Sequence, residues 1–344
     1  MVIATGARGY VSYDFETSYG TGAVFTGGSA AGKRFGMQEK INTWTLNNSR
    51  INLATLNQTE LEGFAYGQET GSLGVGFVLS NPWLFGAIYG VPASTGSSNN
   101  YTHTYEAGIG TNNTRDIRTF ETQIGLDFPS GLITRKLKGC ILRTFGISCN
   151  IGGTVDCSAD IAYSVEDAPD TSTALVAPSK PTTKFPFTFA HASLKLNNAV
   201  VAKIQSADIS FNINPDMLYQ IGSHQAVEAF RRVFEITGTF QASWVNPTLL
   251  NHVLAQVQVP NADAYEETIG GSTPELELTF TNQDSGTPSL PAAEERIITI
   301  TLEGVSPTEH SVAGIEPVEP VIESITWQAK SANIVVHNSE AIEP

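Results

Sequence analysis

A pattern that occurs twice constrains the fold of this chain most. Residues 70–85 read TGSLGVGFVLSNPWLF, and residues 237–250 read TGTFQASWVNPTLL. Each stretch begins with Thr-Gly, places apolar residues at every second position, and ends in Asn-Pro followed by an apolar cluster. Period-two alternation predicts a strand with one buried face. Asn-Pro is a helix-start signal, since Asn can cap the helix and Pro fits its first turn. Both stretches therefore predict a strand followed by a short helix.

Further matches flank this unit in the same order. Lys40-Ile41 opens an alternating stretch, and Lys203-Ile204 opens another. Leu61-Glu-Gly-Phe64 returns as Val227-Glu-Ala-Phe230. Matched landmarks in one order and at nearly constant offsets predict two structurally related halves. The alternative is a set of unrelated β units.

The two predicted helices have apolar stripes at helical spacing. The first begins at Asn81-Pro82 and ends at Gly90, with Trp83, Leu84 and Ile88 as its buried stripe. The second begins at Asn246-Pro247, and its stripe consists of Leu249, Leu250, Val253, Leu254 and Val257.

The rest of the chain predicts an all-β protein with short flanking helices. Charged residues make up only 15% of the chain, against about 25% in an average domain. Glycine and small polar residues take their place, which favours strands joined by turns. Further strand-like segments occupy residues 119–165 and much of the chain after residue 274.

These patterns predict four segments. Residues 1–36 are rich in glycine and predict an extended or looped arm, residues 37–165 a first domain, residues 166–186 a proline-rich connector, and residues 187–344 a second domain. The acidic, proline-containing stretch within residues 305–323 predicts an exposed loop.

Charge and cysteine content limit the partners. A net charge of −15 argues against a nucleic-acid binder that grips phosphates. No apolar run is long enough to span a membrane, and the first residues lack the features of a signal peptide, so we expect a chain made in the cytoplasm. The spacing of Cys140, Cys149 and Cys157 matches no zinc site, so we expect all three to be small, buried, apolar side chains.

No catalytic, metal or cofactor site is predicted. The stretch from Gly27 to Lys33 resembles a phosphate-binding loop, but Arg34 stands where that loop needs Ser or Thr. The six histidines are scattered along the chain, which argues against a metal site. We expect His103, near the start of a strand, to have a structural role. The carboxylate pairs Asp14/Glu16 and Glu316/Glu319 predict solvated side chains instead of an acid and a base.

Several short motifs resemble those of tail tube proteins from long, non-contractile-tailed bacteriophages. They are GARGYVSYDFETSYGT near the N-terminus, Tyr101-Thr-His-Thr-Tyr105, Phe187-Thr-Phe-Ala-His191, and the pattern of Asp208-Ile-Ser-Phe211 followed by Glu235-Ile-Thr-Gly238. The resemblance covers nearly the whole chain. It implies tandem β-sandwich or barrel domains with a flanking helix, which assemble into β-lined rings that stack into a virion tail tube.

The resemblance also implies partners. Two copies in one chain imply a trimeric ring with pseudo-sixfold symmetry, with a hexamer as the alternative. The tape-measure protein and DNA would pass through the lumen without specific binding, and tail tip and tail terminator proteins would cap the tube. The arm and the acidic loop would mediate contacts between rings.

A β-lined tube needs a polar strand face toward its lumen, and the matched strands offer such a face without Lys or Arg. The predicted lumen-lining residues are Thr43, Thr45, Asn47, Gln68, Thr70, Ser72, Ser206, Asp208, Ser210, Glu235, Thr237 and Thr239. In an isolated sandwich, the same face would simply meet solvent. The alternative functions are a secreted or surface β-sandwich binding module, another virion part such as a decoration or head–tail connector protein, and, least supported, a β-rich hydrolase.

Overall fold

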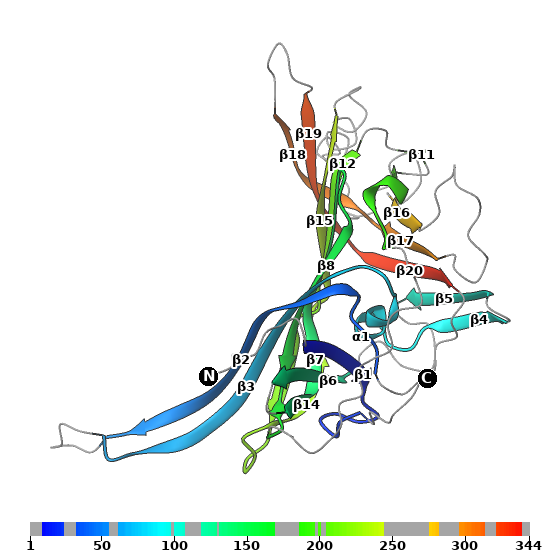
Figure 1. Ribbon diagram of the computed structural model, residues 1–344. Coiled ribbons are helices and arrows are strands. Elements are labelled where there is room, and N and C mark those ends of the chain that lie inside the picture. Colours follow the sequence, from blue (N-terminus) through cyan, green and yellow to red (C-terminus); the bar gives the residue numbers. More distant parts are fainter. Residues whose placement is uncertain are drawn as a thin grey trace.

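Two facing β-sheets form the body of the protein, and a long hairpin projects from it (Figure 1). The structure is a computed structural model. It describes residues 9–23, 32–54, 61–97, 100–106, 118–128, 131–168, 186–196, 199–200, 204–243, 275–281, 296–313 and 321–338. The all-β prediction is confirmed, because strands dominate the described residues and helices are few and short.

The longer sheet has eight antiparallel strands along its main path. Their spatial order is β18 (Ser306–Ala313), β19 (Ile322–Ala329), β15 (Glu235–Ser243), β12 (Ile204–Asn212), β7 (Gly131–Asn150), β8 (Val155–Tyr163), β3 (Gly63–Val78) and β2 (Met37–Leu53). Three strands extend it beside β7, namely β6 (Phe120–Phe128), its partner β1 (Gly9–Phe15), and the short β9 (Val165–Glu166).

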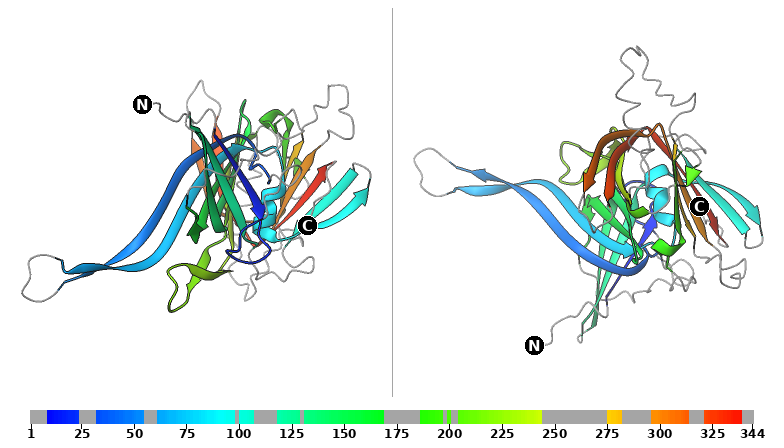
Figure 2. Two further views of the ribbon diagram at one scale, coloured as in Figure 1. Left: turned by 60° about the horizontal axis from the view of Figure 1, so that its bottom comes forward. Right: turned by 90° about the horizontal axis from the view of Figure 1, so that it is seen from above.

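The second sheet covers one face of the first (Figure 2). Its order is β11 (Ala199–Val200), β10 (Ala192–Leu196), β16 (Glu275–Thr281), β17 (Ile297–Glu303), β20 (Ser331–Asn338), β5 (Asn100–Glu106) and β4 (Ala93–Ser97). A separate small hairpin pairs β13 (Pro215–Tyr219) with β14 (Ala226–Arg231). Strands from both halves of the sequence share each large sheet, since β20 pairs with β5 and β12 pairs with β7.

The core lies between the facing sheets. In the central strands β8, β12, β15 and β19 and the inner part of β3, alternate residues are buried in it, as the alternation predicts, whereas the edge strands β2 and β18 have no buried residue. Phe77, Phe145 and Phe211 form a continuous aromatic row across β3, β7 and β12, with neighbouring ring centroids 6.3 Å apart. The opposite sheet contributes residues such as Phe280 and Ile300, which are fully buried. The alternating strands thus create one apolar and one polar face of the long sheet.

The strands of the long sheet follow the same order in each half of the chain. The first half contributes β2-β3-β8-β7 and the second contributes β12-β15-β19-β18, so each set runs first, second, fourth, third in sequence. Cross-strand partners match as well. The pairs Thr45–Ser72, Asn47–Thr70, Gly71–Tyr163 and Leu73–Ile161 have the counterparts Asp208–Thr239, Ser210–Thr237, Gly238–Trp327 and Phe240–Ile325.

The first predicted helix is present and short. It consists of the 3-10 turn η2 (Trp83–Phe85) and α1 (Gly86–Tyr89), and Gly90 ends it with φ of 85°. Leu84 and Ile88 are buried as predicted, and Trp83 is half-buried. Asn81 is not the cap: its amide Nδ2 instead donates a hydrogen bond to the Arg34 carbonyl. The second predicted helix lies outside the described residues.

The N-terminal segment differs from the expected arm. Residues 9–15 form β1, which pairs with β6 along its length and buries Val11 and Tyr13. The Glu16 carboxylate accepts hydrogen bonds from the backbone N–H groups of Gly20, Gly22 and Gly139 and from the Thr119 hydroxyl. The buried side chains of Val11 and Tyr13 and the hydrogen-bonded carboxylate of Glu16 therefore attach this part of the glycine-rich segment to the body.

The predicted loop within residues 305–323 is wrong over its first part. Residues 306–313 form β18 and pair with β19. Proline in a strand is tolerated at a sheet edge, where a missing N–H breaks no second ladder. Pro307 lies in such an edge strand, which explains why proline did not prevent the strand.

Candidate functional site: the polar face and the two edges of the long sheet

The polar face of the long sheet collects the residues predicted to line a lumen. The cross-strand registers place all of them on this face except Gln68. Gln68 lies where the β2–β3 ladder is irregular, between the pairs Asn48–Glu69 and Arg50–Tyr66, so the register does not assign it to a face. Strand pairing thus brings together residues from both halves that sequence analysis treated as two separate sets.

Three more strands contribute to this face. Asp156, Ser158 and Asp160 of β8 alternate with the buried Cys157, Ala159 and Ile161. Ser148 of β7 pairs with both Asp156 and Asp208, and Thr326 of β19 pairs with Thr239. These residues were not predicted to line the lumen, because β7, β8 and β19 lie outside the matched strands. The alternation in DCSADIAY was the signal that could have identified them.

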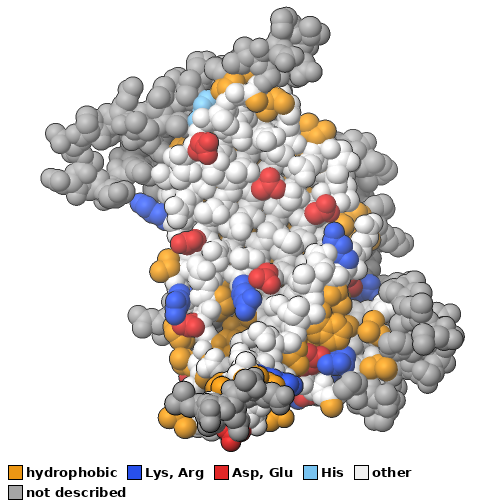
Figure 3. Space-filling view, turned by 90° about the vertical axis from the view of Figure 1, so that its left-hand side faces the viewer, with side chains coloured by type: hydrophobic (Ala, Val, Ile, Leu, Met, Phe, Trp, Pro, Cys, Tyr) orange, Lys and Arg blue, Asp and Glu red, His pale blue; other side chains and the backbone are white. Residues whose placement is uncertain are grey.

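Few charged side chains interrupt this face. Figure 3 shows the side on which it lies, as mostly uncharged side chains and backbone, with scattered acidic groups and, mainly over the lower part of the view, basic groups. The expectation that it carries no Lys or Arg is wrong at Lys40, which extends across the glycine of the pair Lys40–Gly76. Lys40 lines one hollow of this face together with Asp156 and Asp208.

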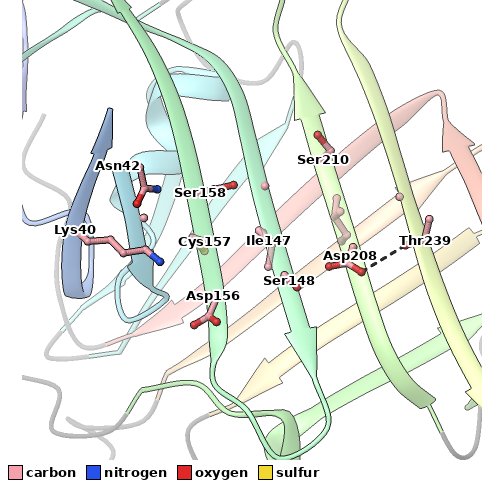
Figure 4. Close-up of a pocket in the computed structure, with 14 residues that line it drawn as sticks. Lys40, Asn42, Ile147, Ser148, Asp156, Cys157, Ser158, Asp208, Ser210 and Thr239 are labelled. Carbon is pink, nitrogen blue, oxygen red and sulfur yellow. Dashed lines mark hydrogen bonds between the residues drawn. The ribbon is translucent and has the colours of Figure 1, made fainter. Parts of the chain in front are cut away.

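A shallow hollow of about 500 Å³ lies in the middle of this face. Lys40, Asp156, Ser148, Asp208 and Thr239 are among its lining residues (Figure 4). The Thr239 hydroxyl donates a long hydrogen bond of 3.4 Å to Asp208, which joins β15 to β12.

Two observations concern the chemistry of the hollow. Cys157 borders it, but burial raises the pKa of this thiol well above its ordinary value, so the reactive thiolate is disfavoured. In the described part of the chain, no three His, Cys, Asp or Glu side chains converge on a point where a metal ion could bind.

The remaining candidate residues have structural contacts. The Lys33 ammonium forms an ion pair of 2.7 Å with Asp14, while most of the glycine stretch before it lies outside the described residues. His103 is buried and hydrogen-bonded to Ser94 and Asn338. The three cysteines are free and buried, as predicted. The pair Glu316/Glu319 lies outside the described residues.

The long sheet ends in two edge strands, β2 and β18. Within the described residues, β2 pairs only with β3, and β18 pairs only with β19. Unpaired strand edges expose backbone donors and acceptors, and a protein must cover them or use them for assembly. The β2 edge also exposes the apolar side chains Ile41 and Leu46.

A β-sandwich with one polar sheet face and two open strand edges is typical of a structural protein that assembles with other chains. The family model for phage tail tube proteins matches residues 6–329. The chain belongs to this family, and it is a structural component of a phage tail. A search of curated proteins returned no significant match. No helix in the described ranges is long and apolar enough to cross a membrane.

Proposed function

We propose that this protein self-assembles into closed rings that stack to form the tail tube through which phage DNA passes. Three chains build each ring, and each chain supplies two tandem copies of the tube unit, so the ring has pseudo-sixfold symmetry. The tape-measure protein and then DNA occupy the lumen, and tail tip and tail terminator proteins bound the tube.

The junction between the two halves of the long sheet carries this proposal. β7, the last strand of the first set, pairs with β12, the first strand of the second set. β18 and β2 are the counterparts of β7 and β12, and both are sheet edges. Pairing β18 of one chain with β2 of the next repeats the internal junction. Such head-to-tail contacts close into a ring when the rotation per chain divides a full turn.

The internal junction also predicts the register between chains. Gly146 pairs with Ser210 in the β7–β12 ladder. Their counterparts by strand register are Ala313 in β18 and Asn47 in β2. We therefore expect Ala313 of one chain to lie opposite Asn47 of the next, on the polar face.

Thiol cross-linking tests ring closure and chain number together. The variant Ala313→Cys/Asn47→Cys is treated with a short bifunctional thiol reagent, and the products are separated under denaturing conditions. We expect a ladder of covalent species that stops at three chains of 36.8 kDa each. A ladder that reaches six chains contradicts the pseudo-sixfold trimer. Ala313→Cys alone is the matched control and yields no ladder, since the three native thiols are buried.

The polar face supports the conduit role. DNA binds proteins mainly through cations that neutralise its phosphates. Asp156, Asp160, Asp208 and Glu235 outweigh Lys40 on this face, so it would repel phosphates more than it attracts them. A lumen of this kind lets DNA pass without retention.

A further inference from the structure

The outer part of the β2–β3 hairpin exposes several apolar side chains to solvent. The hairpin projects from the body in Figures 1 and 2. Its outer part consists of residues 51–53 and 61–66, called here the outer hairpin. Its exposed apolar side chains are Ile51, Leu53, Leu61, Phe64 at 59% and Tyr66 at 74%.

Exposed apolar side chains on a projecting hairpin indicate a contact surface. A two-stranded hairpin without a packed face is marginally stable in water. Contiguous exposed apolar side chains on a soluble protein mark sites of association. The outer hairpin exposes apolar side chains on both faces, Ile51 and Leu53 on one and Phe64 and Tyr66 on the other, so it needs a partner surface.

The second half contains a counterpart of the outer hairpin. In the first half, Leu53 pairs with Gly63 and Asn52 pairs with Phe64. In the small hairpin, Met217 pairs with Ala229 and Asp216 pairs with Phe230, the counterpart of Phe64. Each strand has one more residue between this hairpin and the matched pairs of the polar face than in the first half. The β13–β14 hairpin therefore occupies, in the second half, the position that the outer hairpin occupies in the first.

This counterpart packs against the first half of its own chain. The backbone N–H of Glu69 donates to the His224 carbonyl at 2.9 Å, and the Tyr219 hydroxyl donates to the Glu69 carbonyl at 3.1 Å. The rings of Tyr66 and His224 meet edge to face with centroids 6.0 Å apart. The tip of β13–β14 thus contacts residues 66–69, where the outer hairpin joins the rest of β3.

The matching segment in the second half is residues 233–236, because Thr70 corresponds to Thr237. Here Val233 is 71% exposed and Glu235 is exposed, while Phe234 packs inward against Tyr89 and Phe211. The segment is therefore anchored by Phe234 and offers Val233 and Glu235 to a partner.

We propose that the outer hairpin of each chain packs against residues 233–235 of the neighbouring chain in the same ring. This inference rests on the proposed ring, in which β2 of one chain lies beside β18 of the next. The contact between β13–β14 and residues 66–69 inside one chain is its template. The outer hairpin then links chains within a ring instead of joining stacked rings.

Site-specific photo-cross-linking tests the inference. A benzophenone amino acid replaces Leu61, and purified single rings, separated from tubes, are irradiated. We expect chain-to-chain cross-links that map by mass spectrometry to peptides containing residues 233–235. Cross-links that appear only in stacked tubes, or rings that form without cross-links to that segment, overturn the inference. Failure of the unmodified chain to form rings instead refutes the proposed function.

Substitution provides a second measurement. Leu61→Asp/Phe64→Asp alters exposed side chains only, so the melting temperature of the single chain should not change. We expect the concentration required for ring formation to rise at least tenfold. The matched control is Ile151→Asp, at an exposed apolar residue of the β7–β8 turn, which should leave ring formation unchanged. Normal ring formation by the double variant, with or without shorter tubes, contradicts the inference.

Discussion

Gly71 and Gly238 lie beneath the aromatic rings of their cross-strand partners. A Cβ atom built on Gly71 would lie 2.1 Å from ring atoms of Tyr163, and one on Gly238 would lie 2.3 Å from those of Trp327. These distances are far below van der Waals contact. The Thr-Gly that opens each repeated stretch therefore has a packing role: it makes room for a large buried ring on the next strand.

We expect Gly71→Ala and Gly238→Ala each to lower the free energy of unfolding by about 1–3 kcal/mol, since buried rings cannot move aside without strain. Urea denaturation of the single chain measures the change. Gly63→Ala in the same strand is the control, because a Cβ there meets nothing within 4 Å. Equal effects at Gly63 and Gly71 would contradict this explanation.

Glu121 is a second residue with a defined energetic effect. It is 1% exposed, and burial raises the pKa of its carboxyl to about 7, although the Ala23 N–H and Lys136 and Lys138 favour the charged form. The pKa of this carboxyl is higher in the folded state than in the unfolded chain, so the protonated carboxyl stabilises the folded state. This contribution to the free energy of unfolding is complete below about pH 4.5 and is lost as the pH rises through about 7.

Glu121→Gln should therefore flatten the fall in the free energy of unfolding between pH 5 and 8, by about 1–3 kcal/mol across that window. Denaturation curves at a series of pH values measure this slope. Glu303→Gln, which makes the same substitution at an exposed carboxylate, is the matched control. An unaltered slope in Glu121→Gln would show that its carboxyl ionises normally.

At the scale of elements, β1 shows how a glycine-rich segment becomes part of the body. Its residue Tyr13 is fully buried, and its ring contacts those of Phe35 and Phe120 with centroids 4.7 and 5.6 Å away. Removal of the N-terminal segment through β1 would therefore test folding as well as contacts between rings. Only a shorter truncation can isolate an assembly role.

The same element yields a stability prediction. Tyr13→Ala should cost about 3–5 kcal/mol, the range observed when large aromatic residues are removed from cores. Tyr66→Ala removes the same side chain from a site that is 74% exposed and should change the stability of the single chain by less than about 0.5 kcal/mol. Thermal unfolding of both variants measures the difference, and similar melting temperatures would contradict the burial of β1.

At the scale of the whole molecule, the two sheets expose polar and charged side chains on opposite sides of the protein. One sheet presents its polar face to the proposed lumen, and the other presents residues such as Glu106 and Glu303 on the opposite side. The charge of −15 per chain then acts differently on each surface. Only charge on the luminal side would affect the passage of DNA.

Asp156→Lys/Asp208→Lys should convert the polar face into one that retains DNA. We expect tubes of this variant to bind DNA at 50 mM salt and to release it near 200 mM, since phosphate contacts weaken steeply with salt. Retention of DNA inside assembled tubes is the measurement. Glu106→Lys/Glu303→Lys makes the same charge change on the other sheet. Equal internal retention by both variants would contradict a luminal position for Asp156 and Asp208.

The sequence by itself determined the local structure of this protein. Alternation marked strands such as β3, β12 and β15, and the spacing of Leu84 and Ile88 marked the short helix. These signals are local, because a strand or helix buries a face whose period is written in neighbouring residues. The family resemblance was visible in the same way, through short motifs, and the family match confirmed it.

Only the tertiary structure decided which strands are neighbours. β7 pairs with β12, β20 pairs with β5, and β18 forms a strand where proline and acidic residues predicted a loop. Lys40 reaches the hollow through its place beside Gly76, and β13–β14 lies against β3. These pairings join residues far apart in the chain, and they depend on the summed burial and hydrogen bonding of whole sheets. Local patterns do not encode that sum.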